Sequence, residues 1–172
     1  MIRKATLQDL DAISDIYEEI HTLEEQGKTT IGWIRGVYPT RATAQAALER
    51  DDLFAEEING LVVAAAIINP IQVPVYADAH WEYPAADTEV MVLHTLTVSP
   101  SHSGHGYGKQ FVAFYEQYAL ENGCHYLRMD TNVTNQNARS LYRKLGYKEI
   151  DIVPCVFNGI PGVRLVCLEK KI

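Results

Sequence analysis

A strand, a glycine-rich loop and a helix follow one another in the middle of the sequence, and this order constrains the fold more than any other feature. Residues 91–98 are mostly β-branched and apolar, as in a buried strand, and Pro100 ends that strand. Three alternate glycines then lead into aromatic residues at helical spacing. Because glycine has no Cβ, the N–H groups of such a loop can converge at the positive end of a helix dipole. The sequence therefore predicts an anion site, most naturally for phosphate.

The three glycines, Gly104, Gly106 and Gly108, match neither of two common phosphate-binding loops. A dinucleotide-binding loop has the spacing G-x-G-x-x-G, and a Walker loop continues from Gly-Lys to Ser or Thr, whereas Gln110 follows Lys109 here. Glycines also occur in turns for steric reasons alone. Taken by itself, the loop leaves the phosphate site and the purely steric turn as alternatives.

A second motif lies downstream, in the segment YLRMDTNVTNQNARSLYRKLGY at residues 126–147. Together with the glycine loop, it resembles the GNAT superfamily of acyl-CoA-dependent N-acyltransferases, whose motifs are Q/R-x-x-G-x-G/A and then N-x-x-A-x-x-L/F-Y-x-K-x-G-F/Y. The second motif is matched by Asn135, Ala138, Leu141, Tyr142, Lys144, Gly146 and Tyr147. Ser103 stands where the first motif usually has Gln or Arg, so the resemblance implies a pyrophosphate site made by the backbone rather than by that side chain.

The composition is that of an ordinary globular protein. The 172 residues, 47% hydrophobic and 22% charged, suffice for one domain, which we expect to span residues 1–172. The net charge of −7 argues against nucleic acid as a partner and favours cationic amines. No apolar run approaches the ~20 residues of a membrane span, and the N-terminus lacks a signal-peptide core, so we expect a cytoplasmic protein without a membrane partner.

The three cysteines, Cys124, Cys155 and Cys167, are odd in number and form no C-x-x-C pair. Reduced thiols are therefore expected rather than disulfides or a zinc site, and no metal is predicted.

The pattern of apolar residues predicts further strands and helices on both sides of the central loop. Strands are expected at residues 2–5, 53–58, 61–68, 91–98, 125–131, 147–153 and 163–169, and helices at residues 7–23, 40–50, 109–122 and 135–145. Asn59-Gly60 and Asn158-Gly159 are typical of tight hairpin turns. We therefore predict an α/β (α+β), GNAT-like fold with a mixed, mostly antiparallel sheet, a central parallel strand pair and flanking helices.

The resemblance also implies where acetyl-CoA, the co-substrate, binds. Backbone groups of the central strand would hold the pantetheine arm, the loop would wrap the pyrophosphate, and the start of the last helix would contact the arm. The residues so implied are Leu96, Thr97, Val98, Ser103, Gly104, His105, Gly106, Tyr107, Gly108, Lys109, Asn135 and Tyr142. Lys109 is alternatively a solvated residue, and Asn135 is also suited to cap its helix.

Three residues are candidates for proton transfer. Tyr142 is the predicted donor to the leaving thiolate, although its helical stripe also suits a packed structural tyrosine. His94 is the first candidate base, because period two places it on the same strand face as Leu96 and Val98; a core histidine is the alternative. Glu89, near the start of the strand, is the second candidate, and solvent could also deliver a neutral amine.

The resemblance implies an N-acetyltransferase that moves an acetyl group from acetyl-CoA to a primary amine by direct attack. The acceptor, a small-molecule or peptide amine, is not identified by the sequence, and a homodimer stays open. Five aromatic residues either wall the acceptor pocket or pack their loops: Trp33, Tyr38, Tyr76, Trp81 and Tyr83. The alternative function is a non-catalytic acyl-CoA-binding or regulatory module, against which Tyr142 argues because such a module needs no proton donor.

Overall fold

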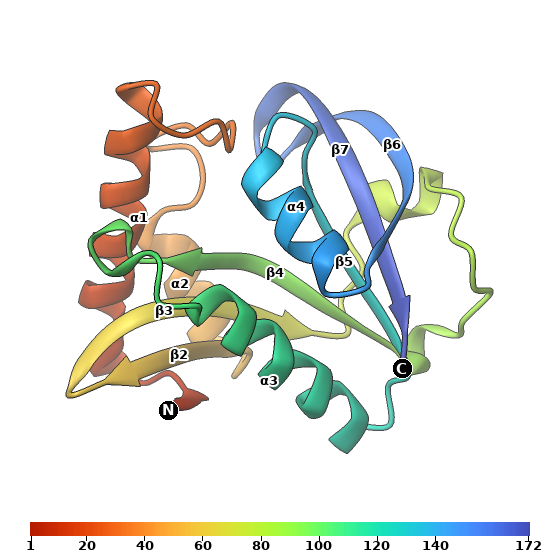
Figure 1. Ribbon diagram of the computed structural model, residues 1–172, viewed down its shortest axis with the longest axis horizontal. Helices are drawn as coiled ribbons and strands as arrows, with labels where there is room; N and C mark the ends of the chain where they lie inside the picture. The colour runs from red at the N-terminus through yellow and green to blue at the C-terminus, as the bar shows by residue number, and fades with distance from the viewer.

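Seven strands form one sheet in the order β1-β2-β3-β4-β5-β7-β6 in the computed structural model, which describes residues 1–172 (Figure 1). The strands are β1 (Ile2–Lys4), β2 (Leu53–Ile58), β3 (Leu61–Asn69), β4 (Val90–Val98), β5 (Tyr126–Asn132), β6 (Lys148–Phe157) and β7 (Ile160–Lys171). The helices are α1 (Leu10–Glu25), α2 (Arg41–Glu49), α3 (Tyr107–Glu121) and α4 (Gln136–Lys144), with 3-10 turns η1 (Leu7–Asp9), η2 (Pro74–Asp78), η3 (Asp87–Glu89) and η4 (Pro100–His102). Only β4 and β5 pair in parallel, which confirms the predicted fold class.

Both predicted hairpin turns are present. Asn59 and Gly60 join β2 to β3 with φ values of 51° and 80°, and Asn158 and Gly159 join β6 to β7 with 51° and 78°. Positive φ at both central residues matches the right-handed twist of the flanking strands, and Asn-Gly adopts it at little cost. The β6–β7 hairpin does not simply follow β5, because β7 lies between β5 and β6.

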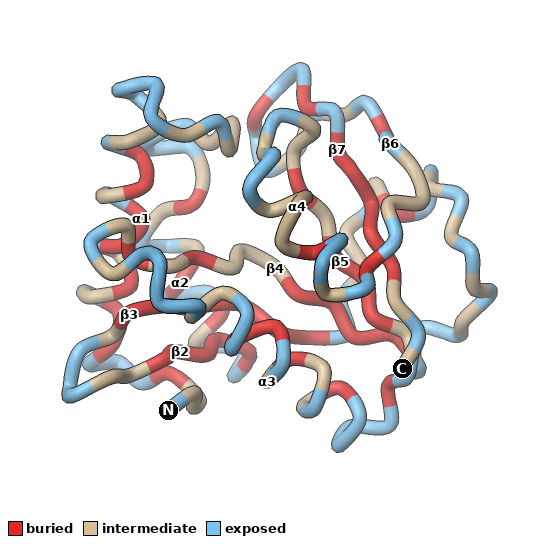
Figure 2. The backbone as a smooth tube through the Cα atoms, viewed as in Figure 1, coloured by how far each residue is buried: buried red, intermediate tan, exposed pale blue.

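Helices cover the two faces of the sheet differently. Helices α1 and α2 pack on one face of β2 and β3, where their cluster includes Tyr17 and Ile67, and α3 and α4 pack on the opposite face along β4, β5 and β7. The β5–β7 part of the face opposite α4 is covered instead by the segment that joins β3 to β4. The buried backbone in Figure 2 accordingly runs through the strands and the inward faces of the helices.

The sheet splits at its centre. Parallel pairing of β4 with β5 runs from Val90–Tyr126 to Leu93–Met129 and then stops, although both strands continue. Figure 1 shows β4 and β5 lying close together near the C-terminus of the chain and diverging from there. The edge of β4 from residue 94 to 98 therefore faces β5 without a strand partner.

An irregularity in β4 overturns one prediction. Thr95 has a φ of 51°, and the register with β3 shifts between the Ala65–Thr97 and Ile67–His94 pairs. Met91 and Leu93 pack toward α3, and after the bulge so do Leu96 and Val98. His94 therefore lies on the opposite face from Leu96 and Val98, and the prediction that period two keeps all three on one face was wrong, because a bulge inserts one residue into the alternation.

The long connection between β3 and β4 is packed against the sheet. Arg128 on β5 donates to Glu169 on β7 and to the carbonyl of Tyr83, and it lies 4.1 Å from the ring centre of Trp81. Trp81 in turn packs edge-on against Tyr76. Arg128 and these aromatic residues hold the connection against the sheet. A buried arginine–carboxylate pair is stable only when its remaining hydrogen bonds are also made, and the connection supplies one of them.

No helix is both long and apolar enough to cross a membrane. The three cysteines are unpaired, with Cys124 and Cys167 buried.

Candidate active site

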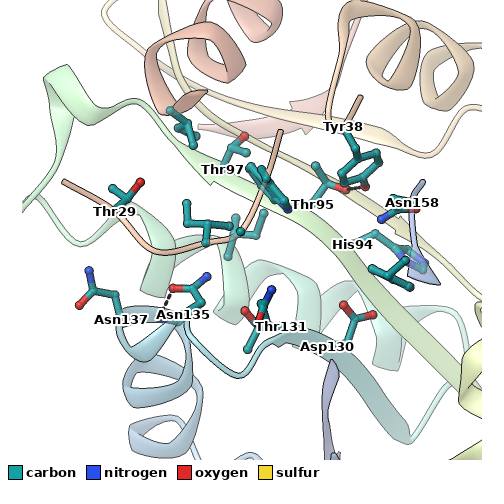
Figure 3. A pocket seen from close by; sticks show the side chains of 18 of the residues that line it. Thr29, Tyr38, His94, Thr95, Thr97, Asp130, Thr131, Asn135, Asn137 and Asn158 are labelled. Atoms are coloured by element: carbon teal, nitrogen blue, oxygen red, sulfur yellow. Dashed lines mark hydrogen bonds between the residues drawn. The ribbon is translucent and has the colours of Figure 1, made fainter. Parts of the chain in front are cut away.

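A cavity of about 460 Å³ lies where β4 and β5 diverge. Its walls come from β4, β5, the start of α4, the loop between α1 and α2, and the β6–β7 hairpin. Figure 3 shows Tyr38, His94 and Asn158 gathered at one end, and Thr29, Asn135 and Asn137 at the other. Segments far apart in the sequence thus meet at this split in the sheet.

The two faces of the sheet give the cavity two sides. On the α4 side it is lined by Leu96, Val98, Ala138 and Tyr142, which belong to the cluster under α3 and α4. The other side is lined by the α1–α2 loop and the hairpin, including Trp33, Tyr38, Phe157, Ile160 and Val163. We call these the helix side and the hairpin side. A molecule on one side can meet a molecule on the other only through the gap between the strands.

The helix side suits the arm of acetyl-CoA, which the sequence predicts along residues 96–98. These residues line the cavity, and the N–H and C=O groups on their β5 edge have no strand to pair with. Such an edge binds an extended chain by adding hydrogen bonds like those of a further strand. The structure therefore fits an extended arm with amide groups at this place.

The glycine loop begins at the mouth of the helix side, where Ser103 lines the cavity. Gly104 and Gly106 have φ values of 83° and 81°, and Gly106 is the N-cap of α3. A Cβ on either glycine would meet no atom within 4 Å, so the backbone conformation and not crowding requires glycine there. The loop thus leaves the first N–H groups of a 15-residue helix open to an anion.

Gly108 has a different reason to be glycine. A Cβ there would lie 3.4 Å from Cδ2 of Leu141 on α4 and 3.8 Å from Cγ2 of Val98 on β4. Gly108 therefore allows α3 to approach its neighbours closely. The steric alternative holds for Gly108, whereas a positive φ favours glycine at the other two positions.

The side chains around the loop contribute unequally. His105 bonds through Nδ1 to the carbonyl of Ser103 at 3.0 Å and stacks on Tyr107, so it folds over the loop itself. Lys109 is exposed in the first turn of α3 and has no partner within the protein. Its ammonium is free to approach a phosphate from solvent.

Tyr142 and Asn135, both predicted to contact acetyl-CoA, line the cavity. Asn135 is the N-cap of α4, with its side-chain oxygen accepting from the N–H of Ala138 at 3.2 Å. Tyr142 is only 7% exposed, and burial, with a smaller effect of the Asp130 charge, raises its pKa above the ordinary value of 10.0. The phenol therefore stays protonated at neutral pH and can act as a proton donor.

His94 lines the cavity, but its environment does not suit a base. Asn69 donates to Asp52 at 2.7 Å and accepts from the N–H of Ile71 at 2.9 Å, which turns its Oδ1 toward Nε2 of His94 at 3.0 Å. Nε2 must then be the donor in this hydrogen bond. Burial lowers the pKa of His94 to about 4, and the charge of Asp52 only partly opposes this, so the ring accepts a proton poorly at neutral pH.

Other predicted residues lie away from the cavity. Glu89 precedes β4 at the end remote from the split, where its carboxylate accepts from the N–H of Ala86. Tyr76, Trp81 and Tyr83 pack the connection, so of the five aromatic candidates only Trp33 and Tyr38 line the cavity. For these three aromatic residues the packing alternative holds, and their sequence positions did not reveal which of the two roles they would have.

Asp130 also lines the cavity, although it was not among the predicted site residues. This residue follows Met129, the last residue of β5 that pairs with β4, and its carboxylate points into the cavity toward the end where His94 lies (Figure 3). The hydroxyl of Tyr76 donates to Oδ2 at 2.7 Å. Burial raises the pKa of Asp130 to about 6 despite that hydrogen bond. One feature of the sequence could have pointed to Asp130: it is an acidic residue within a strand that also carries the buried Leu127 and Met129.

The model of the acetyltransferase (GNAT) family matches residues 10–147 of the chain. The chain belongs to the GNAT family. Family members use acetyl-CoA as co-substrate, and the open edge of β4 and the glycine loop are the parts of this chain that fit it.

Individual relatives agree with this assignment. The uncharacterized N-acetyltransferase MJ1207 of Methanocaldococcus jannaschii is 24% identical over 153 residues, which cover 88% of this chain and 62% of MJ1207. The chain thus matches less than two thirds of that relative's length. A GNAT-family acetyltransferase from Streptococcus agalactiae superimposes with a TM-score of 0.82 at 21% identity, covering 100% of this chain and 95% of that one.

A third relative was solved together with acetyl-CoA. The putative acetyltransferase yncA of Salmonella typhimurium, solved with its cofactor acetyl-CoA, superimposes with a TM-score of 0.70 at 19% identity, covering 99% of this chain and 92% of that one. Both structural relatives have the same fold as this chain.

Proposed function

We propose that this protein transfers the acetyl group of acetyl-CoA to a primary amine by direct attack of the amine nitrogen on the thioester. The observation that carries the proposal is the split between β4 and β5, with an open strand edge and a glycine loop on one side and a second, separately lined side opposite. Acetyl-CoA supplies an activated acetyl thioester. The chain's task is to hold it, bring the amine to it and manage the protons.

The proposed roles follow from position. Backbone groups of Leu96 to Val98 bind the arm, and the N–H groups at the start of α3 bind the pyrophosphate, with Lys109 adding a charge. The hairpin side admits the amine. One C–N bond forms and one C–S bond breaks; Tyr142 gives a proton to the leaving sulfur, and the nitrogen loses its protons to restore the phenol and to solvent.

A non-catalytic acyl-CoA-binding module is the second candidate function. Its support is that the strand edge and the glycine loop would serve binding alone. A protonated phenol among the residues that line the helix side favours the enzyme, because binding by itself has no use for a proton donor there.

The test is release of free thiol from acetyl-CoA mixed with primary amines, measured for the wild type and Tyr142→Phe. The variant keeps the ring, so acetyl-CoA should bind nearly unchanged while kcat falls by up to ~10²-fold. Tyr147→Phe is the matched control, because it also deletes a buried phenol hydroxyl, one that donates to Glu116 and lies outside the cavity. Full turnover by Tyr142→Phe with chemistry rate-limiting would make Tyr142 a packing residue, and no thiol release with any amine would favour the binding module.

A further inference from the structure

The charges around the cavity restrict what can enter its hairpin side. Asp130 is the one aspartate or glutamate among the lining residues, and none of them is a lysine or an arginine. The charge of Arg50 acts to lower the pKa of His94 and of Tyr38. Arg50 is bound to Asp52 at 2.9 Å, however, and does not line the cavity. The side chains of the hairpin side therefore offer a partner to one positive charge and to no negative charge.

The carboxylate of Asp130 is held ready for a ligand. Tyr76 is buried in the cluster under the connection and donates to Oδ2, which fixes the direction of the group. Oδ1 has no hydrogen-bond partner within the protein and is not sealed from the cavity. An ionised carboxylate with an open oxygen in such a place gains most from a charged donor, because each charge compensates the desolvation of the other.

The remaining walls of the hairpin side are largely apolar. Five apolar lining residues belong to the same cluster as Tyr76, the donor to Asp130: Trp33, Phe157, Ile160, Val163 and Leu165. Hydroxyl and amide groups are also present, on Thr95, Tyr38, Asn132 and Asn158, and the first two are bonded to each other. These walls suit a hydrocarbon or aromatic body.

We propose that the acceptor is a small primary amine with an apolar or aromatic body and no acidic group, and that Asp130 binds its ammonium. This inference rests on the proposed function, and it excludes free α-amino acids from the favoured acceptors. A carboxylate brought into this cavity would lose water, find no cation and lie near Asp130. Before attack, the ammonium loses one proton, either to Asp130 or through it to solvent. This is the proton that is released when an ammonium is converted to an amide.

The experiment compares three compounds that share one side chain: phenethylamine, phenylalanine methyl ester and phenylalanine. We expect phenethylamine and the ester to have kcat/KM values about a hundredfold or more above that of phenylalanine, because like charges in one desolvated site cost several kcal/mol. Phenylalanine within tenfold of its ester would overturn the proposal. The ester is the decisive partner, since it keeps the α-amine and the side chain and removes only the acid charge.

Binding is measured alongside turnover, by calorimetry with the protein saturated in CoA, so that the two hypotheses fail separately. Amine binding without thiol release would contradict the proposed function and leave the acceptor class supported. Thiol release or binding that favours the free amino acid would overturn the acceptor class and leave the transferase intact. Absence of detectable binding and turnover for both the amine and the ester would also overturn the acceptor class.

The variant Asp130→Asn tests the residue itself. It keeps an acceptor for the Tyr76 hydroxyl and removes only the charge, so Kd for phenethylamine should rise about thirtyfold or more. Stabilisation by acetyl-CoA should be unchanged, which shows that the variant is folded. Asp78→Asn is the matched control, because this exposed carboxylate lies outside the cavity and changes the net charge equally. Unchanged amine affinity in Asp130→Asn would remove Asp130 from the site.

Discussion

Replacing Asp130 by asparagine should make the protein more stable at neutral pH while weakening its acceptor site. Burial raises the pKa of Asp130 from 3.8 to about 6, so the folded protein disfavours the ionised carboxylate. Between these two pH values the folded state binds more protons than the unfolded state, and the free energy of unfolding therefore falls as the pH rises. Asparagine does not titrate, so Asp130→Asn should escape this loss.

The size of the effect follows from the displacement of the pKa. A change from 3.8 to about 6 corresponds to about 3 kcal/mol at most, reached above pH 6, since each pKa unit is worth 1.36 kcal/mol. Water in the cavity reduces this figure by screening the charge. For a chain of this size, each kcal/mol moves the melting temperature by roughly 2–4 °C, so the variant should melt up to ~10 °C higher at pH 8.

The assay is thermal unfolding of the wild type, Asp130→Asn and Asp78→Asn at several pH values between 4 and 8. The advantage of Asp130→Asn should be small at pH 4, grow up to pH 6 and stay constant above it, while Asp78→Asn should show no such trend. If Asp130→Asn is no more stable than the wild type at pH 8, or if its advantage does not depend on pH, the carboxylate is hydrated and the reasoning fails.

Two further predictions concern the acetyl-CoA site and the pH dependence of catalysis. Acetyl-CoA at a hundredfold excess over Kd should stabilise the wild type by about 2.7 kcal/mol, and Gly106→Val should lose this effect because valine is strained at a φ of 81°. Gly60→Val, equally strained in the β2–β3 turn, should keep it, and a retained shift in Gly106→Val would place acetyl-CoA elsewhere. The kcat/KM value should rise with pH through about 6 as Asp130 ionises. Tyr76→Phe removes a hydrogen-bond donor to the Asp130 carboxylate and should move this rise to higher pH. A rise at unchanged pH would mean that another group titrates.

The helix side of the site was largely predictable because its signals are local. The glycine loop, the cap at Asn135 and the cavity-facing Tyr142 each depend on residues within a few positions along the chain. Local sequence determines turn conformation, caps and helical stripes through backbone sterics and short-range hydrogen bonds. The Asn-Gly turns of both hairpins were predictable for the same reason.

The hairpin side depended on contacts that the sequence does not mark. The bulge at Thr95 turns His94 to the other face, and β7 enters between β5 and β6 to bring Phe157 and Val163 to the cavity. Strand order and register are chosen by the burial of whole faces, since a one-residue shift exchanges the two sides of a strand. The role proposed for Asp130 likewise depends on where β4 and β5 part. The sequence by itself determined the order of elements and the glycine loop, whereas tertiary packing decided which charge faces the cavity, because only packing sets which side chains lose water together.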